Sequence, residues 1–126
     1  GTDYDQINVT GTVDLTGGDL SLTILSGLEF GDYYFLVLND SSDPVTGIFA
    51  SLNGVATDLS QGATFTSGGR EFQISYTASG FGASPSLVGG NDVALLVVPE
   101  PSTWALVGLA FALVLGRARP RRVRAA

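Results

Sequence analysis

The sequence contains no cysteine, histidine, lysine or methionine. Without cysteine, neither disulfides nor thiolate metal sites can stabilise the fold. Histidine is the usual general base, lysine the usual Schiff-base former, and cysteine the strongest nucleophile at neutral pH. Because residues 1–98 offer only carboxylates, hydroxyls, tyrosines and one arginine, we predict no enzymatic site, no metal and no cofactor there. Hydrolysis by a pair of carboxylates is the catalytic chemistry that these side chains still allow.

Basic residues are nearly absent from most of the chain. Residues 1–98 contain eleven acidic residues and a single base, Arg70, which gives a formal net charge of −10, whereas residues 99–126 carry +4. Strong acidity favours solubility and opposes binding to nucleic acid or to an anionic membrane surface. The break in charge predicts two parts, an acidic region over residues 1–98 and a separate C-terminal region over residues 99–126.

The N-terminus lacks both an initiator methionine and a basic segment followed by an apolar one. A leader of that kind directs export and is removed from the mature chain. Its absence predicts that the sequence is a fragment or a processed product of a longer protein. At about a hundred residues, the acidic region is long enough to bury a modest core.

Residues 1–98 also lack any sustained i, i+3, i+4, i+7 pattern of apolar side chains, which argues against helices. Instead, apolar and polar residues alternate with a period of two, and β-branched residues, aromatics and glycines dominate. Residues 78–92 are rich in Ala, Ser and Gly and are expected to form a surface loop. The fold class is therefore predicted to be all-β. The predicted strands cover residues 6–15, 20–24, 33–38, 70–77 and 93–98, with shorter extended segments at residues 48–52 and around Phe65.

Periodicity alone does not choose among the all-β architectures. Gly17-Gly18-Asp19, between the first two predicted strands, fits either a hairpin or one corner of a coil. Six or seven short strands with glycine-rich turns suit a sandwich, a jelly roll or the end of a β-solenoid. We therefore predict a short-stranded β-solenoid end or cap, or a sandwich-like β region, over residues 1–98.

One uncharged apolar segment, Trp104 to Gly116, follows the acidic region. A helix over residues 101–117 would be about 25 Å long against a bilayer core of about 30 Å, so it spans a membrane if the bilayer thins locally. A buried helix of the folded domain is the alternative, but a buried helix rarely ends in five arginines. We therefore predict a single C-terminal transmembrane helix. Its main apolar side chains are Trp104, Leu106, Leu109, Phe111, Leu113 and Leu115.

A basic cluster closes the chain and consists of Arg117, Arg119, Arg121, Arg122 and Arg124. Positive residues next to a transmembrane helix stay on the cytoplasmic side of the membrane. This rule places residues 1–98 outside the cytoplasm. Binding of nucleic acid is the alternative role for such a cluster, but directly after an apolar helix the topological role is favoured.

Three elements therefore occur in order at the C-terminus: Pro99-Glu100-Pro101, the apolar segment and the arginine cluster. This order closely resembles the PEP-CTERM sorting signal of exported bacterial proteins. The resemblance implies recognition of Pro99, Glu100 and Pro101 by an exosortase, a membrane-embedded cysteine transpeptidase, and cleavage near that motif. It also implies transient anchoring in the inner membrane and delivery to the cell surface or extracellular matrix, where exopolysaccharide is a further candidate partner. For the tripeptide alone, a stiff linker is the alternative.

Four upstream segments, residues 4–11, 61–65, 72–77 and 90–93, look like the terminal part of autotransporter-type β-solenoid proteins. That resemblance implies a right-handed parallel β-helix upstream, which ends in a cap of irregular and partly antiparallel strands. The loop from Ala78 to Gly90 is longer than this pattern usually has.

Two loops carry the oxygen ligands that hard cations prefer. The segment Gly89-Gly90-Asn91-Asp92-Val93 resembles a fragment of a calcium-binding nonapeptide repeat. One copy does not build that site, so a turn before a strand is the favoured interpretation. Asp40 and Asp43, with Ser41 and Ser42 between them, form a second candidate cation site. Because Asn, Asp, Ser and Pro cluster in turns for backbone reasons, a turn is favoured there too.

Aromatic and basic residues supply further candidates. Tyr33, Tyr34 and Phe35 form a candidate platform for stacking sugars, although aromatics in an apolar run usually belong to the core. Arg70 is the only base in residues 1–98 that could bind an anion, and a surface role is favoured for it. Asn8-Val9-Thr10 matches the glycosylation sequon, a pattern of little specificity that here lies in a predicted strand.

These observations favour a non-enzymatic, exported structural or extracellular-matrix-associated protein that an exosortase recognises and processes. One alternative is the C-terminal part of an extracellular carbohydrate-active β-helix enzyme, whose catalytic carboxylates would lie further upstream. Another is an adhesin that binds glycans or calcium.

Overall fold

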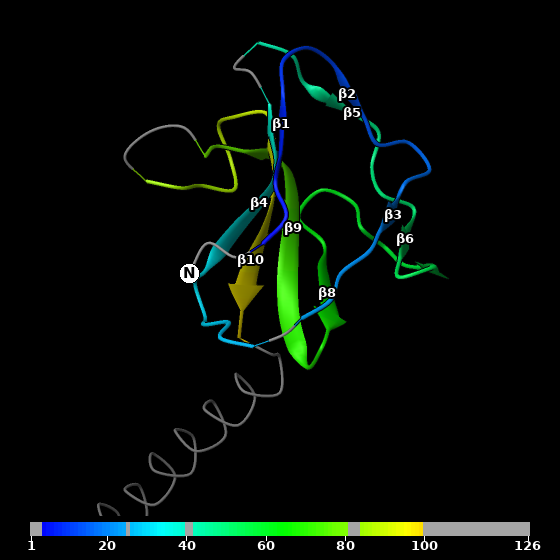
Figure 1. Cartoon of the computed structure of the whole chain (residues 1–126), viewed down its shortest axis with the longest axis vertical. Helices are drawn as coiled ribbons and strands as arrows, with labels where there is room; N and C mark the ends of the chain where they lie inside the picture. Colours follow the sequence, from blue (N-terminus) through cyan, green and yellow to red (C-terminus); the bar gives the residue numbers. More distant parts are fainter. Residues whose placement is uncertain (1–3, 25, 40–41, 81–83, 100–126) are drawn as a thin grey trace, which may run out of the picture.

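The computed structural model describes residues 4–24, 26–39, 42–80 and 84–99. This part of the chain forms ten strands and no helix, as the all-β prediction requires (Figure 1). Within it, no helix has the length and apolar character needed to cross a membrane, and the predicted transmembrane helix lies outside it. The strands are β1 (Ile7–Val9), β2 (Val13–Asp14), β3 (Asp19–Leu20), β4 (Tyr33–Asn39), β5 (Val45–Thr46), β6 (Ser51–Leu52), β7 (Val55–Ala56), β8 (Thr64–Ser67), β9 (Arg70–Ala78) and β10 (Asp92–Val98).

The largest sheet has five strands in the order β1-β4-β10-β9-β8. β1 and β4 are parallel, whereas all the other neighbours are antiparallel. The predicted strands at residues 33–38, 70–77 and 93–98 are confirmed as β4, β9 and β10. β10 is the last of these strands in the sequence, yet it occupies the centre of the sheet between β4 and β9. The sheet is therefore complete only once residues 92–98 are in place.

The first part of the chain forms two successive passes that lie side by side in parallel. β1 pairs with β4, β2 with β5, and β3 with β6, and each of these pairs is parallel. The repeat distance is nearly constant, with paired residues 30, 32 and 32 positions apart: Ile7 with Val37, Val13 with Val45, and Asp19 with Ser51. Pairing then becomes antiparallel from β6 to β7 and in the hairpin of β8 and β9.

The predicted single strand over residues 6–15 is wrong, because the chain bends between β1 and β2. Gly11 lies at the bend with a φ of 115°, a conformation that side chains with a Cβ avoid. The turn at residues 17–19 likewise does not make a hairpin of β2 and β3, since each of them pairs with a strand of the next pass. It forms a corner between them, which was the other interpretation of its glycines.

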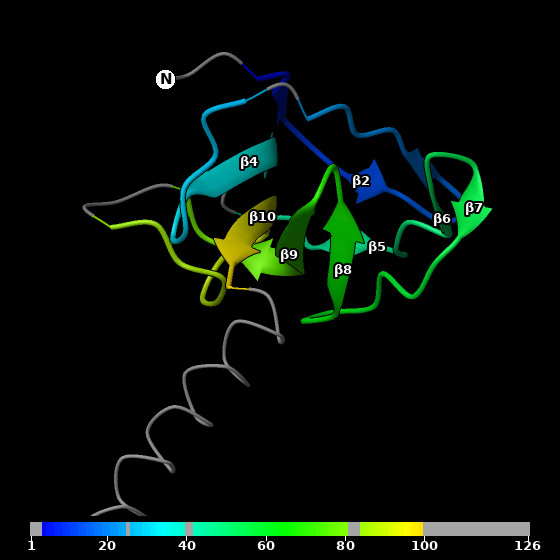
Figure 2. The ribbon, with the colours of Figure 1, turned by 90° about the horizontal axis from the view of Figure 1, so that it is seen from below.

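The main core lies between the five-stranded sheet and the short strands, which close its other side (Figure 2). Phe72, Ile74 and Tyr76 point into it from one face of β9, as their period-two spacing predicts. β10 contributes Leu95 and Val97, which are each only 1% exposed. Val97 is thus a core residue two positions before Pro99.

A second, smaller cluster covers the opposite face of the sheet. Phe35, Ala78 and Ala94 form its buried centre, and Leu87 from the loop after β9 packs against it. The carbonyl of Leu87 also accepts a hydrogen bond of 2.5 Å from the Ser75 hydroxyl. The loop that the sequence places at the surface therefore folds back over β9, and β4 has apolar contacts on both faces, as its continuous apolar run predicts.

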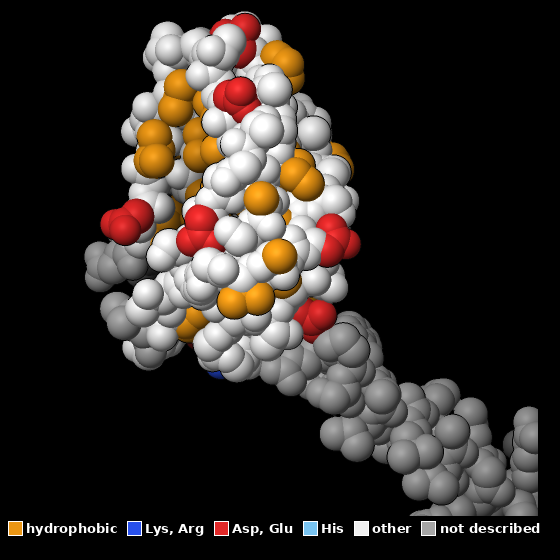
Figure 3. Space-filling view, turned by 90° about the vertical axis from the view of Figure 1, so that its right-hand side faces the viewer, with side chains coloured by type: hydrophobic (Ala, Val, Ile, Leu, Met, Phe, Trp, Pro, Cys, Tyr) orange, Lys and Arg blue, Asp and Glu red, His pale blue; other side chains and the backbone are white. Residues whose placement is uncertain are grey.

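Acidic side chains are scattered over the face of the molecule that Figure 3 shows. Several acidic residues accept hydrogen bonds in turns. The Asp19 carboxylate accepts hydrogen bonds from the Ser51 hydroxyl at 2.5 Å and from the Gly54 N–H at 2.8 Å, and so ties β3 to the turn between β6 and β7. These bonds, that of Ser51 first, hold the pKa of Asp19 below its ordinary value of 3.8. Hydrogen bonds from Thr16 lower the pKa of Asp14, and those from Ser60 lower the pKa of Asp58.

Because the pKa of Asp19 is lower in the folded state than its ordinary value of 3.8, its stabilising contribution is present above that pH and is lost as the pH falls through the folded pKa. We expect the loss of stability between about pH 5 and pH 2.5 to be smaller in Asp19→Asn than in the natural sequence. Ser51→Ala, which removes the leading donor, should act in the same direction. Urea unfolding at both pH values measures the difference, and an unchanged pH dependence in both variants would contradict the prediction.

Candidate functional site

The candidate site is the end of the sheet at which β10 finishes and Pro99 follows. Val97 exchanges two backbone hydrogen bonds of 2.9 Å with the segment before β4: its N–H donates to Asp32 O, and its carbonyl accepts from Gly31 N. Val98 is paired with Glu71 of β9 on the other side. The chain is therefore held in the sheet up to the residue that precedes Pro99.

A tight turn, Glu29–Asp32, supplies the partners of Val97. Asp32 N donates to Glu29 O at 3.2 Å, and Glu29 N donates to the Asp32 carboxylate at 3.0 Å. Gly31 is the third residue of this turn and has a φ of 89°. A positive φ at the third position of a turn favours glycine, which adopts it without strain. The turn presents the Gly31 N–H and the Asp32 carbonyl to β10 in a fixed geometry.

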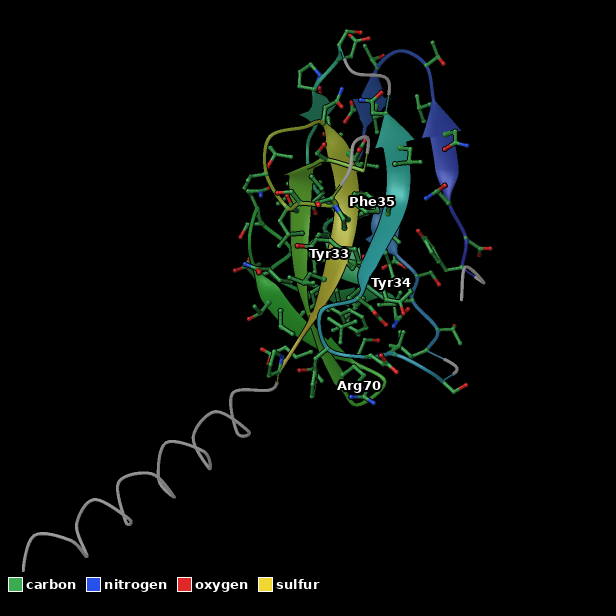
Figure 4. The ribbon with its side chains drawn as sticks, turned by 90° about the vertical axis from the view of Figure 1, so that its left-hand side faces the viewer. Tyr33, Tyr34, Phe35 and Arg70 are labelled. Carbon is green, nitrogen blue, oxygen red and sulfur yellow. The ribbon has the colours of Figure 1, made fainter. Side chains whose placement is uncertain are left out.

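Phe30 and Arg70 meet across this end of the sheet. Phe30 precedes β4 and is 54% exposed, and the Arg70 guanidinium carbon lies 5.6 Å from the centre of its ring, within cation–π distance. Arg70 begins β9 and lies at the end of the sheet where β10 finishes (Figure 4). Since β4 and β9 flank β10 on opposite sides, the contact joins the two neighbours of β10. We call Phe30, Gly31, Asp32 and Arg70 the exit clasp.

Glu71, next to the clasp, is a buried acidic residue that the sequence did not single out. It is 7% exposed, and its Oε2 atom has no hydrogen-bond partner among the described residues. The alternation along β9 gives no signal for Glu71, because it predicts only that Phe72, Ile74 and Tyr76 share the face toward the core. The contact between Phe30 and Arg70 was also missed, since only the order of the strands brings these distant positions together.

Comparison with known families bears on this end of the chain. Residues 97–122 match the PEP-CTERM protein-sorting motif. The match begins at Val97, so the matched segment starts inside β10. It marks the chain as an exported protein that is sorted by way of the membrane and is a target of exosortase. The chain matches none of the curated proteins and none of the solved structures with which it was compared.

Most of the predicted sorting residues lie outside the described residues. Of the motif, the structure describes Pro99, which directly follows β10 and is partly buried, while Glu100 and Pro101 lie beyond it. The apolar residues from Trp104 to Leu115 and the arginines from Arg117 to Arg124 also lie outside. Their roles as a membrane span and a cytoplasmic cluster stay predictions.

The three aromatics of β4 do not form a common platform. Tyr33 and Phe35 stack with their ring centres 6.1 Å apart, but Phe35 is buried at 8% exposure. Tyr34 packs instead against Tyr4 in an edge-to-face contact of 5.1 Å, and its hydroxyl donates to the Asp32 carboxylate at 3.4 Å. Burial, followed by the charge of Asp32, raises the pKa of Tyr34 above its ordinary value. The preference for a core role over a sugar platform is confirmed for Phe35.

The two candidate cation loops lie next to each other, where β4 ends and β10 begins. The Asp43 carbonyl accepts hydrogen bonds from the side-chain amides of Asn39 and Asn91, at 2.6 and 2.8 Å. Asp92 is 1% exposed and accepts from Asn39 N at 2.8 Å and from Gly80 N at 2.7 Å. Asp40 and Ser41 lie outside the described residues, within which no three metal-binding side chains gather. Of the segment Gly89-Gly90-Asn91-Asp92-Val93, the first three residues form a bend and the last two begin β10, as the interpretation of a turn before a strand requires.

Proposed function

We propose that residues 1–98 are a non-enzymatic structural or matrix-associated cargo, which an exosortase releases from a membrane anchor by cleavage near Pro99-Glu100-Pro101. The single observation that carries the sorting part of this proposal is the motif match at residues 97–122, which begins at the second-last residue of β10. The described part places its last core side chain at Val97. Cleavage after Val98 would therefore leave the fold intact, whereas cleavage before β10 would remove its central strand.

The parallel passes support a solenoid character for this cargo. Three successive strand pairs, β1 with β4, β2 with β5 and β3 with β6, share a nearly constant repeat of 30 to 32 residues. Stacking of chain passes at a fixed period is the arrangement of β-solenoids, whose terminal coils depart from the repeat and act as caps. Antiparallel pairing from β7 onward fits the role of such a cap. We propose that this region ends a β-solenoid displayed at the cell surface or in the extracellular matrix.

The sorting proposal is tested by replacing Pro99, Glu100 and Pro101 with alanine in a chain that carries a C-terminal tag. We expect the tag to be removed from the natural sequence in a host with exosortase and to be retained by the variant, because the recognised residues are gone. Retention of the tag by the natural sequence in a host without exosortase identifies the enzyme. Pulse-labelling followed by detection of both chain ends measures the outcome.

A matched control changes Ser84 and Pro85 to alanine; both are exposed and belong to the loop that joins the end of β9 to the start of β10. This control should be processed like the natural sequence. Equal removal of the tag from the alanine variant of the motif would contradict the proposal.

A further inference from the structure

The five-stranded sheet includes the first two residues of the matched sorting motif, so the residue directly before Pro99 is still paired in the sheet. The motif match begins at Val97, a residue that is 1% exposed and has both of its backbone polar groups bonded to the Glu29–Asp32 turn. Val98 is paired with Glu71. One residue therefore separates the last buried side chain from Pro99.

An enzyme that cleaves near Pro99 needs an extended segment on either side of the bond that it breaks. Enzymes that recognise an extended strand do so through its backbone N–H and C=O groups. The N–H and C=O groups of Val97 are already hydrogen-bonded to Asp32 and Gly31, respectively. An extended residue spans only about 3.3 Å, so Val98 alone provides almost no reach into an active site. The end of β10 has to leave the sheet before the segment fits.

The exit clasp opposes this opening. Neighbouring strands lie about 4.8 Å apart, so the ends of β4 and β9 are separated by about 10 Å with β10 between them. Phe30 and Arg70 close this distance with their 5.6 Å contact. The contact holds the two neighbours of β10 together at its end, and the turn that carries Phe30 also supplies the bonds to Val97.

We infer that the exit clasp controls the rate at which the sorting motif becomes available to the exosortase, an inference that rests on the proposed function. In the closed sheet, Val97 and Val98 are withheld from the enzyme. Local opening of the last residues of β10 exposes them, and cleavage follows. Phe30 and Arg70 are then positioning residues that act through β10 and need not touch the enzyme. Local opening at an element end is among the lowest-energy fluctuations of a folded domain, so a single surface contact suffices to alter it.

The test follows removal of a C-terminal tag from the full chain in a host with exosortase. We expect Phe30→Ala to speed processing about two- to fivefold, the factor that corresponds to losing one exposed cation–π contact. Arg70→Gln should act in the same direction without touching the Glu29–Asp32 turn. Val55→Ala is the matched control, since Val55 is 66% exposed and lies in β7, outside the five-stranded sheet. Its processing should not change.

A spacer variant distinguishes the effect of opening β10 from the effect of the short distance between the folded sheet and Pro99. About six Gly and Ser residues inserted between Val98 and Pro99 span about 20 Å, and should speed processing at least as much as Phe30→Ala. In this background Phe30→Ala should add nothing, because the motif is already free. Hydrogen exchange of the Val97 amide in the detergent-solubilised full chain gives an independent measurement, and it should become faster in Phe30→Ala and Arg70→Gln.

Two results would overturn the inference. One is a spacer that speeds processing while both clasp variants leave it unchanged, since distance rather than strand opening would then be limiting. The other is faster exchange at Val97 with no change in processing. Failure of the proposed function looks different: the tag would be lost even when Pro99, Glu100 and Pro101 are alanines, whatever the clasp variants do.

Discussion

Phe72→Ala is expected to lower the free energy of unfolding by about 3–5 kcal/mol, the cost of removing a fully buried aromatic side chain and leaving a cavity. Phe72 is 1% exposed and stacks on Phe65 with ring centres 5.6 Å apart. It lies opposite Phe65 of β8 and Val97 of β10, so its ring joins three strands of the sheet. Domains of this size are stable by about 5–15 kcal/mol, which makes the loss a large part of the total.

Urea unfolding of the full chain, followed by circular dichroism, measures this change. Val88→Ala serves as the control because Val88 is 67% exposed, and such surface changes usually stay within about 0.5 kcal/mol. A loss of less than about 1.5 kcal/mol for Phe72→Ala would show that the neighbouring side chains collapse into the space, and would contradict the central place given to this ring.

The long strands of this protein can be predicted from its sequence because the patterns that indicate them are local. Phe72, Ile74 and Tyr76 alternate along β9, and the apolar runs of β4 and β10 are bounded by glycines and turn-forming residues. Each pattern depends only on residues within about ten positions. The sorting motif was readable for the same reason, since its elements follow one another in order.

The two parallel passes could not be predicted in this way. β2, β3, β5 and β6 are two residues long, too short for any periodicity, and each pairs with a strand about 32 positions away. A break at Gly11 also divides what reads as one strand. The exit clasp has the same origin: Phe30 and Arg70 come together because β10, the last strand, is inserted between β4 and β9. Strand order is a property of the whole chain and has no local signature.

The strand order at the start of β10 depends on one polar side chain, that of Asp92. It is 1% exposed, and its two carboxylate oxygens accept from Asn39 N at the end of β4 and from Gly80 N in the loop after β9. These two donors come from segments that approach the start of β10 from opposite sides. A buried N–H group that loses its acceptor costs about 1–3 kcal/mol.

Asp92→Ala is therefore expected to lower the free energy of unfolding by about 1–3 kcal/mol, mainly because it leaves the buried N–H group of Asn39 without an acceptor, whereas Gly80 is exposed and its N–H group can bond to water instead. Asp92→Asn keeps one acceptor oxygen and replaces the other with a donor, so it should lie between alanine and the natural residue. Asp58→Ala is the matched control, since Asp58 is exposed and its carboxylate bonds to nearby Ser60. If Asp92→Ala and Asp58→Ala proved equally mild in urea unfolding, the junction of β4, β10 and the Gly80 loop would not depend on this carboxylate. A large loss for Asp92 alone would show that the central strand is fixed at its first residue by a polar side chain.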